Sequence, residues 1–248
     1  MSARNRLPRI FAPLVIAMII ALAVPTGAMA SQYSPPWADL ICSHYPGSGG
    51  LDTETACANA FARLNAAGYH SFNDFNVTGV TAMSTSYAQS DAIWAVFGHG
   101  GPGGISTFPT YPNGSAWSNV FSDPSHGTCN VSGSTNACIS NYSVSQLHAI
   151  RLMLFAGCET AQTNELSWNA YNKGVDSSIG FSQLIYQDHV NVWTDRFFYY
   201  AATSGLDEYN AAVAAENDVY AQFGGYGGTN SSVIWGSFTM LKPAGYGS

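Results

Sequence analysis

Two apolar runs, each closed by a glycine turn, constrain the fold of this chain most strongly. Ala92–Phe97 leads into Gly98-His99-Gly100, and Arg151–Ala156 leads into Gly157-Cys158. A short apolar run bounded by glycine is typical of a strand that is buried on both faces, as in a parallel sheet covered by helices. Ligands of such sheets bind beyond the carboxyl ends of the strands. We therefore expect both turns at one edge of one sheet.

The rest of the chain alternates between strand-like and helix-like patterns. The other expected strands are Leu40–His44, His70–Val77, Ser178–Ile185 and Ser232–Leu241. The expected helices are Glu54–Ala67, with Thr53 as N-cap, then Val80–Gln89, Ser143–Ile150, Thr160–Tyr171, Gln187–Thr203 and Leu206–Phe223. This alternation predicts a three-layer α/β/α fold with an open, mostly parallel sheet. Residues 101–142, rich in Gly, Pro, Ser and Asn, are expected to form a long loop or hairpin insertion.

The N-terminus has the pattern of a secretory signal peptide. Three arginines precede the apolar run Ile10–Val24, and Ala28-Met29-Ala30 supplies a small-residue cleavage site. The run is too short for a membrane-spanning helix. We expect cleavage after residue 30, a secreted product without a membrane anchor, and one domain over residues 31–248. The sequence does not indicate the oligomeric state.

Charge and metal-ligand spacing exclude several functions. Only five of the eight basic residues lie after residue 30, against fifteen acidic residues, so nucleic acid is not an expected partner. The histidines other than His99, namely His44, His70, His126, His148 and His189, do not have the spacing of zinc ligands. No metal site or cofactor is predicted, although the sequence leaves a structural calcium ion open.

The cysteine count leaves one thiol without a partner. An exported protein usually pairs its cysteines, and this chain has five. Cys42 with Cys57 and Cys129 with Cys138 are the expected disulfides, since each pair flanks a short glycine-containing segment. Cys158 is then the free thiol. A buried, inert thiol is the alternative.

A histidine and a cysteine that follow two strands of one sheet can act together as the base and the nucleophile of covalent catalysis. His99 can serve as the general base and acid, and Cys158 as the nucleophile. The backbone amides of Gly100 and Cys158 can bind the oxyanion that the attack creates. The histidine precedes the cysteine by 59 residues.

The two motifs WAVFGHGG and RLMLFAGCETA resemble the His-Gly and Ala/Gly-Cys motifs of the caspase-like (clan CD) cysteine peptidases. The Cys-Glu-Thr ending is most similar to CHAT domains, and gingipains belong to the same group. The resemblance implies a secreted endopeptidase with a His99/Cys158 dyad that hydrolyses peptide bonds of peptides or proteins through a thioester acyl-enzyme. Gly157 departs from it, because many relatives have alanine there.

The residues that would select a substrate are less defined. Because basic residues are scarce, a basic or neutral substrate residue before the cleaved bond is favoured over an acidic one. Asp176, Asp188 and Asp195 are the candidates for an acidic pocket wall.

Two other interpretations compete with a peptidase. One is a caspase-like fold without catalysis that serves as a binding protein or scaffold. The other is an α/β-hydrolase, because His99-Gly100-Gly101-Pro102-Gly103 matches the HGGPG oxyanion loop. That fold requires a G-x-S-x-G nucleophile turn, which the sequence lacks.

Overall fold

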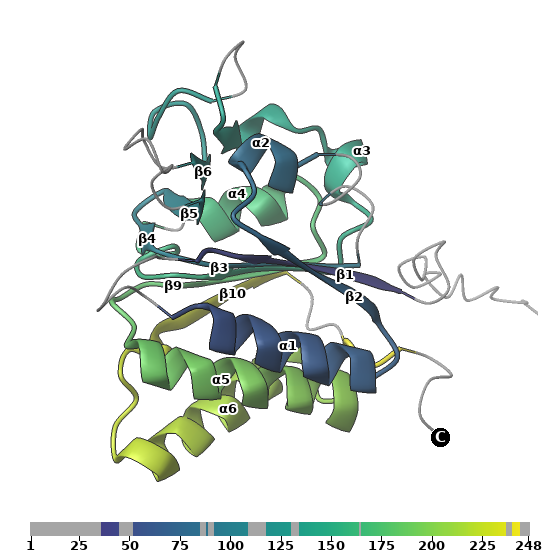
Figure 1. Ribbon diagram of the computed structural model, residues 1–248, viewed down its shortest axis with the longest axis vertical. Coiled ribbons are helices and arrows are strands. Elements are labelled where there is room, and N and C mark those ends of the chain that lie inside the picture. Colours follow the sequence, from purple (N-terminus) through teal and green to yellow (C-terminus); the bar gives the residue numbers. More distant parts are fainter. Residues whose placement is uncertain are drawn as a thin grey trace, which may run out of the picture.

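A six-stranded sheet runs through the middle of the molecule (Figure 1). The computed structural model describes residues 36–44, 52–84, 88, 92–108, 118–129, 134–163, 165–236 and 240–243. The strands, in their order across the sheet, are β10 (Ser232–Gly236), β9 (Ser177–Phe181), β8 (Leu152–Ala156), β3 (Ile93–Phe97), β1 (Trp37–Cys42) and β2 (His70–Phe75). All neighbouring strands run parallel except β10, which pairs with β9 in the antiparallel sense.

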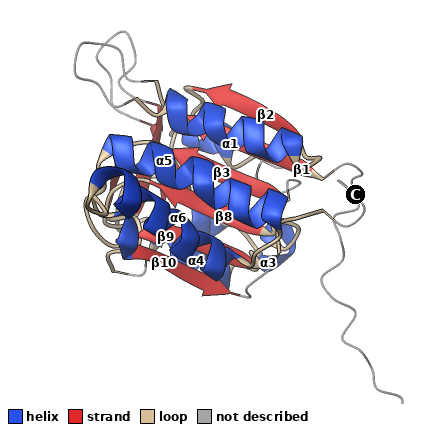
Figure 2. Ribbon diagram, turned by 90° about the horizontal axis from the view of Figure 1, so that it is seen from below, coloured by secondary structure: helices blue, strands red, loops and turns tan. Residues whose placement is uncertain are grey.

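Helices cover both faces of this sheet, which confirms the expected fold class (Figures 1 and 2). One face carries α1 (Glu54–Ala66), α5 (Gln187–Phe198) and α6 (Glu208–Phe223). The other carries the shorter α2 (Gly79–Ala82), α3 (Val144–Leu147) and α4 (Leu166–Asn172). Every residue of β3, β8 and β9 is buried, because each strand packs against side chains on both sides.

Side chains of the central strands alternate between two hydrophobic cores. Leu40 and Leu154 belong to the core that also contains Trp193 and Phe197 of α5. Phe155, the residue next to Leu154, belongs to the second core, beside Trp94. This period of two is the strand pattern that makes a two-sided sheet hydrophobic throughout.

The expected insertion contributes a second sheet above the first. Its strands are β4 (Gly100–Gly101), β5 (Gly104–Phe108), β6 (Ser118–Phe121) and β7 (Ala137–Cys138). Gly101 pairs with Gly104, so Pro102 and Gly103 form the turn of a hairpin. Gly103 has φ 74°, the left-handed conformation that glycine adopts without strain at the third position of a type II turn. Turn geometry thus explains the HGGPG sequence, and the observed fold gives no support to the α/β-hydrolase alternative.

Several predicted elements differ from the structure at their ends. The helix expected from Thr160 begins only at Leu166, because the Thr160 hydroxyl lies within hydrogen-bonding distance of the Phe155 and Gly157 carbonyls and fixes a turn. The strand expected to reach Ile185 ends at Phe181. The helix expected over 80–89 ends at Ala82, and residues 85–87 and 89–91 lie outside the described part of the chain.

The last two helices form a pair that packs along the sheet. After α5 the chain continues as a π-helical segment, Tyr199–Ser204, that ends at Gly205 with φ 76°. Asp207 caps α6 by accepting a hydrogen bond from the Asn210 amide at 2.9 Å. Short 3-10 turns, Ile139–Asn141 and Thr229–Ser231, complete the elements.

The predicted signal peptide lies outside the described residues. Within the described ranges, no helix has the length and apolar character needed to cross a membrane.

Candidate active site

The catalytic candidates follow two strands that pair side by side. Phe97 at the end of β3 pairs with Ala156 at the end of β8. His99 and Cys158 therefore stand at equivalent positions, each two residues beyond a paired strand end. Parallel register alone brings their backbones to the same edge of the sheet.

The glycines of the two turns allow their backbones to touch. A Cβ atom on Gly100 would lie 2.3 Å from the Cys158 carbonyl oxygen, and one on Gly157 would lie 2.8 Å from the Gly98 carbonyl oxygen. Neither contact is compatible with a side chain unless the backbone moves. This explains why position 157 holds glycine where the resemblance leads one to expect alanine.

The hairpin of the insertion supports the His99 turn from the other side. The Ser106 amide of β5 donates to the His99 carbonyl at 2.8 Å. The Ser106 carbonyl in turn accepts a hydrogen bond from the Ser43 hydroxyl at 2.8 Å. A Cβ atom on Gly98 would lie 2.2 Å from the same carbonyl oxygen. The His99 backbone is thus held between β5 and the Cys158 turn.

Cys158 is a free, half-buried thiol whose sulfur lies against the loop after β9. The Ile185 amide donates to Sγ at 3.4 Å, and Sγ lies 3.7 Å from the Ile185 carbonyl, which can accept the thiol proton. The next residue, Glu159, has φ 55°, a conformation uncommon for residues other than glycine. Strained backbone of this kind often accompanies functional residues.

Thr160 fixes the cysteine turn from beneath. Its buried hydroxyl lies 3.0 Å from the Phe155 carbonyl and 3.1 Å from the Gly157 carbonyl, and it accepts a hydrogen bond from the Phe181 amide at 3.1 Å. The interaction ties the turn after β8 to the end of β9. The sequence predicts Thr160 only as the start of a helix, because a hydrogen bond to a residue 21 positions away has no local signal.

The His99 side chain is exposed at the mouth of the site, and the partial burial of the ring lowers its pKa below the ordinary 6.5. Burial has this effect because it disfavours the charged imidazolium. A neutral imidazole at neutral pH is the form that can accept a proton.

Both catalytic candidates line one pocket of about 150 Å³. A cavity of this size can take a benzene-sized group, so it has room for one substrate side chain. Its walls come from the β1–α1 connection and first turn of α1, the two catalytic turns, and the start of α5, namely Asp52, Thr53, Ala56, Phe97, Gly98, His99, Ala156, Gly157, Cys158, Ile185, Gln187, Val190 and Asn191.

The three aspartates proposed for an acidic wall are not among these residues, so the structure does not support that assignment. Asp176 precedes β9, and its amide donates to Ile150 just before β8, so it lies at the opposite edge of the sheet. Asp195 pairs with Arg63 at 2.7 Å on the helical layer. Asp188 is exposed on the first turn of α5.

Asp52 is the one acidic residue among the described residues that line the pocket. Thr53 is the N-cap residue of α1, as predicted, but its side chain forms no capping hydrogen bond. The Asp52 carboxylate supplies that interaction, since it accepts hydrogen bonds from the Thr55 amide at 3.2 Å and hydroxyl at 2.7 Å. The Thr53 hydroxyl instead bonds the Ser43 carbonyl. The Asp-x-x-Thr spacing is a signal that could have predicted the Asp52–Thr55 hydrogen bonds, but not that Asp52 lines the pocket.

Both expected disulfides are present, Cys42–Cys57 and Cys129–Cys138. Within the described ranges, no three His, Cys, Asp or Glu side chains gather as metal ligands. The structural calcium ion that the sequence leaves open remains to be tested.

The sheet order, the covering helices and the two turns place the fold in the caspase-like class. Among solved structures it is similar to the Arg-specific cysteine proteinase gingipain R, with a TM-score of 0.57 and 11% identity over 83% of this chain. It is also similar to a complex of the pro- and mature domains of RgpB from Porphyromonas gingivalis, with a TM-score of 0.52, 11% identity and 84% coverage.

These similarities concern the fold. This chain spans about half of the length of the gingipain chains, 47% and 48%. No protein-family model matches the sequence, and no curated protein matches it. The particular resemblance to CHAT domains stays a prediction.

Proposed function

We propose that this chain is a secreted cysteine endopeptidase with His99 as general base and Cys158 as nucleophile. The observation that carries the proposal is the close approach of the two glycine turns, which brings the free Cys158 thiol and the His99 imidazole to one pocket. The two disulfides support export, because such bonds persist in oxidising surroundings. The gingipain-like fold supports a peptide or protein as substrate.

The chemistry proceeds in two balanced steps. His99 accepts the thiol proton, and the Cys158 sulfur attacks the scissile carbonyl carbon. The Gly100 and Cys158 amides donate to the resulting oxyanion. The carbon–nitrogen bond breaks, the amine leaves with the proton from His99, and a thioester remains. Water, deprotonated by His99, then attacks the thioester and releases the carboxylic acid and the free thiol.

Asp52 supports a basic substrate residue before the cleaved bond. A carboxylate in the wall of a pocket of side-chain size attracts an arginine or lysine side chain and disfavours an acidic one. The relative of similar fold is named an Arg-specific proteinase, which agrees with this assignment.

A peptide library that varies the residue before the cleaved bond tests the activity. We expect wild type to cleave, and Cys158→Ala to lose all turnover. Iodoacetamide should label Cys158 more slowly in His99→Ala, which lacks the base. No turnover with any residue, or equal labelling rates in both proteins, would contradict the dyad and favour a binding or scaffold role.

The specificity is tested separately with Asp52→Asn. We expect kcat/KM for arginyl and lysyl substrates to fall by about 10- to 200-fold, the range of one pocket contact. Alanyl substrates should be affected far less. Asp188→Asn is the matched control, because it removes an exposed carboxylate that does not line the pocket. An equal loss for both substrate classes would contradict the assignment.

A further inference from the structure

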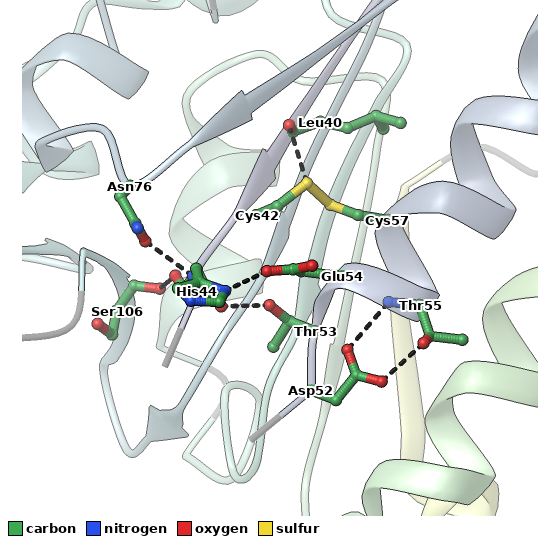
Figure 3. The surroundings of a disulfide bond; sticks show 11 residues. Leu40, Cys42, His44, Asp52, Thr53, Glu54, Thr55, Cys57, Asn76 and Ser106 are labelled. Atoms are coloured by element: carbon green, nitrogen blue, oxygen red, sulfur yellow. Dashed lines mark hydrogen bonds and ion pairs between the residues drawn. A yellow bond between two sulfur atoms is a disulfide. The ribbon is translucent and has the colours of Figure 1, made fainter. Parts of the chain in front are cut away.

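One wall of the pocket is formed by Asp52, Thr53 and Ala56 at the start of α1, and a disulfide ties this part of the chain to the end of β1. Cys42 is the last residue of β1, and Cys57 lies in the first turn of α1 (Figure 3). Asp52, which lines the pocket, lies between them. Both cysteines are completely buried. The disulfide therefore anchors the start of α1 to the same sheet that carries the catalytic turns.

Polar contacts also join the residues that follow β1 to the start of α1, and Figure 3 shows them around the disulfide. His44 forms an isolated bridge with Asp52 and an ion pair with Glu54, and the Thr53 hydroxyl donates to the Ser43 carbonyl. The Ser43 amide donates to the Phe97 carbonyl at 3.1 Å, two residues before His99. The position of the pocket wall that contains Asp52 is thus linked to the position of His99.

Core packing and several polar contacts join α1 to α5, and Asp52 itself contacts α5 through one hydrogen bond. The Asp52 amide donates to Oε1 of Gln187, at the start of α5, at 2.7 Å. This bond, the His44–Glu54 pair and the Asp52–Thr55 cap all lie at exposed positions. Exposed ion pairs and hydrogen bonds contribute little to stability, because water competes for the same groups. Water does not compete with the buried disulfide or with the buried Thr53–Ser43 hydrogen bond, and of these two the disulfide is the covalent constraint.

We infer that formation of the Cys42–Cys57 disulfide completes the substrate pocket, so that the chain selects its substrates only after oxidation. The inference rests on the proposed function and adds a regulation to it. In the oxidation step, the two thiols lose two protons and two electrons to a disulfide oxidant, which becomes a dithiol. A chain that folds in reducing surroundings has the Cys158 thiol, but no disulfide ties the pocket wall that contains Asp52 to β1.

Cys158 and the Cys42–Cys57 pair have opposite redox requirements. The nucleophile must remain a thiol, while the pocket wall requires a disulfide. Because both cysteines of the disulfide are fully buried, a reductant reaches them only when the first turn of α1 opens. The disulfide therefore persists in the folded protein while the half-exposed Cys158 stays reactive. A peptidase built in this way recognises its substrates less well before the disulfide has formed.

The test compares two double variants that each remove one disulfide. Cys42→Ala/Cys57→Ala removes the anchor of the pocket wall. Cys129→Ala/Cys138→Ala is the matched control, because it removes the disulfide of the insertion. Thermal melts establish that both are folded at the assay temperature. In each variant Cys158 is the only free thiol, so its reaction rate with an alkylating reagent can be measured directly.

Two reagents separate pocket recognition from thiol reactivity. We expect a peptidyl-arginyl chloromethyl ketone to label Cys158 in Cys42→Ala/Cys57→Ala at least about tenfold more slowly than in wild type, the scale of one lost pocket contact. Iodoacetamide, which needs no pocket, should react at the wild-type rate. The control should match wild type with both reagents. Equal arginyl-reagent rates in wild type and the anchor variant would overturn the inference.

A second measurement decides the inference even if the proposed function fails. Hydrogen exchange of the Asp52 amide reports the bond to Gln187 without any substrate. We expect faster exchange in Cys42→Ala/Cys57→Ala than in wild type or the control, and an unchanged rate would overturn the inference. Wild type that reacts with iodoacetamide but not with the arginyl reagent would contradict the proposed specificity, and the exchange rates would still decide whether the disulfide holds the wall.

Discussion

Gly100 lies so close to Cys158 that a Cβ atom at position 100 would stand 2.3 Å from the Cys158 carbonyl oxygen. Gly100→Ala should therefore push the two turns apart. We expect a loss of stability of about 1–3 kcal/mol, as for other overpacked positions, and a larger loss of kcat/KM because the oxyanion amides move. Urea unfolding and peptide hydrolysis measure the two effects.

Gly101→Ala is the control for this substitution. A Cβ atom there would have no neighbour within 4 Å, although the position is adjacent and also glycine. It should retain wild-type activity and stability. If Gly100→Ala behaved in the same way as Gly101→Ala, the close contact between the two turns would not be needed for catalysis.

The placement of the two turns is the part of the site that sequence reasoning reaches most directly. A run such as Leu152–Ala156 is apolar at every position, and only a strand buried on both faces explains that pattern over so short a length. The residues that follow neighbouring parallel strands then lie at the same edge of the sheet. No knowledge of the side-chain positions is needed to bring His99 and Cys158 to one end of the sheet.

The pocket wall could not be reached in this way. Asp52 lies there because the chain returns from β1 into α1 beside Gln187, a contact across 135 residues. Asp176 precedes both the expected strand, which starts at Ser178, and β9, so it lies at the edge of the sheet opposite to the catalytic turns. The packing of loops against distant parts of the chain has no local sequence signal. The ends of strands can therefore be predicted from the sequence, but the residues that form the pocket walls cannot.

Thr160 should be essential to the geometry of the cysteine turn. Thr160→Val keeps the shape but removes the hydroxyl, which leaves the buried Phe181 amide without its acceptor. We expect a loss of about 1–3 kcal/mol in unfolding free energy, the cost of an unsatisfied buried group, together with reduced kcat/KM. Thr160→Ser retains the hydroxyl and should keep most of both. Equal behaviour of the Val and Ser variants would show that the bond is dispensable.

The activity should extend to lower pH than an ordinary histidine base permits. Partial burial lowers the pKa of His99 below 6.5, so the pH at which half of the imidazole is protonated lies below that of an ordinary histidine. Activity is then lost as the pH falls through this lowered pKa. The acid limb of kcat/KM against pH should have its midpoint below 6.5. A midpoint at or above 6.5, or an NMR titration of His99 in Cys158→Ala that gives such a value, would be inconsistent with a desolvated base.

If the protein cleaves after basic residues, the placement of its own basic residues should protect it from self-cleavage. Beyond residue 30 the chain has five basic residues, and the structure holds each of them away from easy cleavage. Arg63 and Arg196 lie within helices and pair with acidic side chains. Arg151 bonds the Met240 carbonyl, and Lys173 donates to the Ser140 carbonyl at 2.7 Å. Lys242 is exposed but precedes Pro243, which lacks the amide proton of an ordinary cleavage site.

Long incubation of the purified protein tests this self-resistance. We expect mass spectrometry to show wild type as intact as Cys158→Ala, because peptidases need an exposed, locally unfolded segment. Thr163→Arg places a basic residue in the exposed turn before α4 and should introduce self-cleavage after position 163, which Thr163→Arg/Cys158→Ala would abolish. Fragments of wild type that end at Arg63, Arg151 or Lys173, absent from Cys158→Ala, would show that these contacts do not protect the chain. Intact Thr163→Arg in an otherwise active enzyme would instead mean that cleavage requires more than a basic residue in an accessible turn.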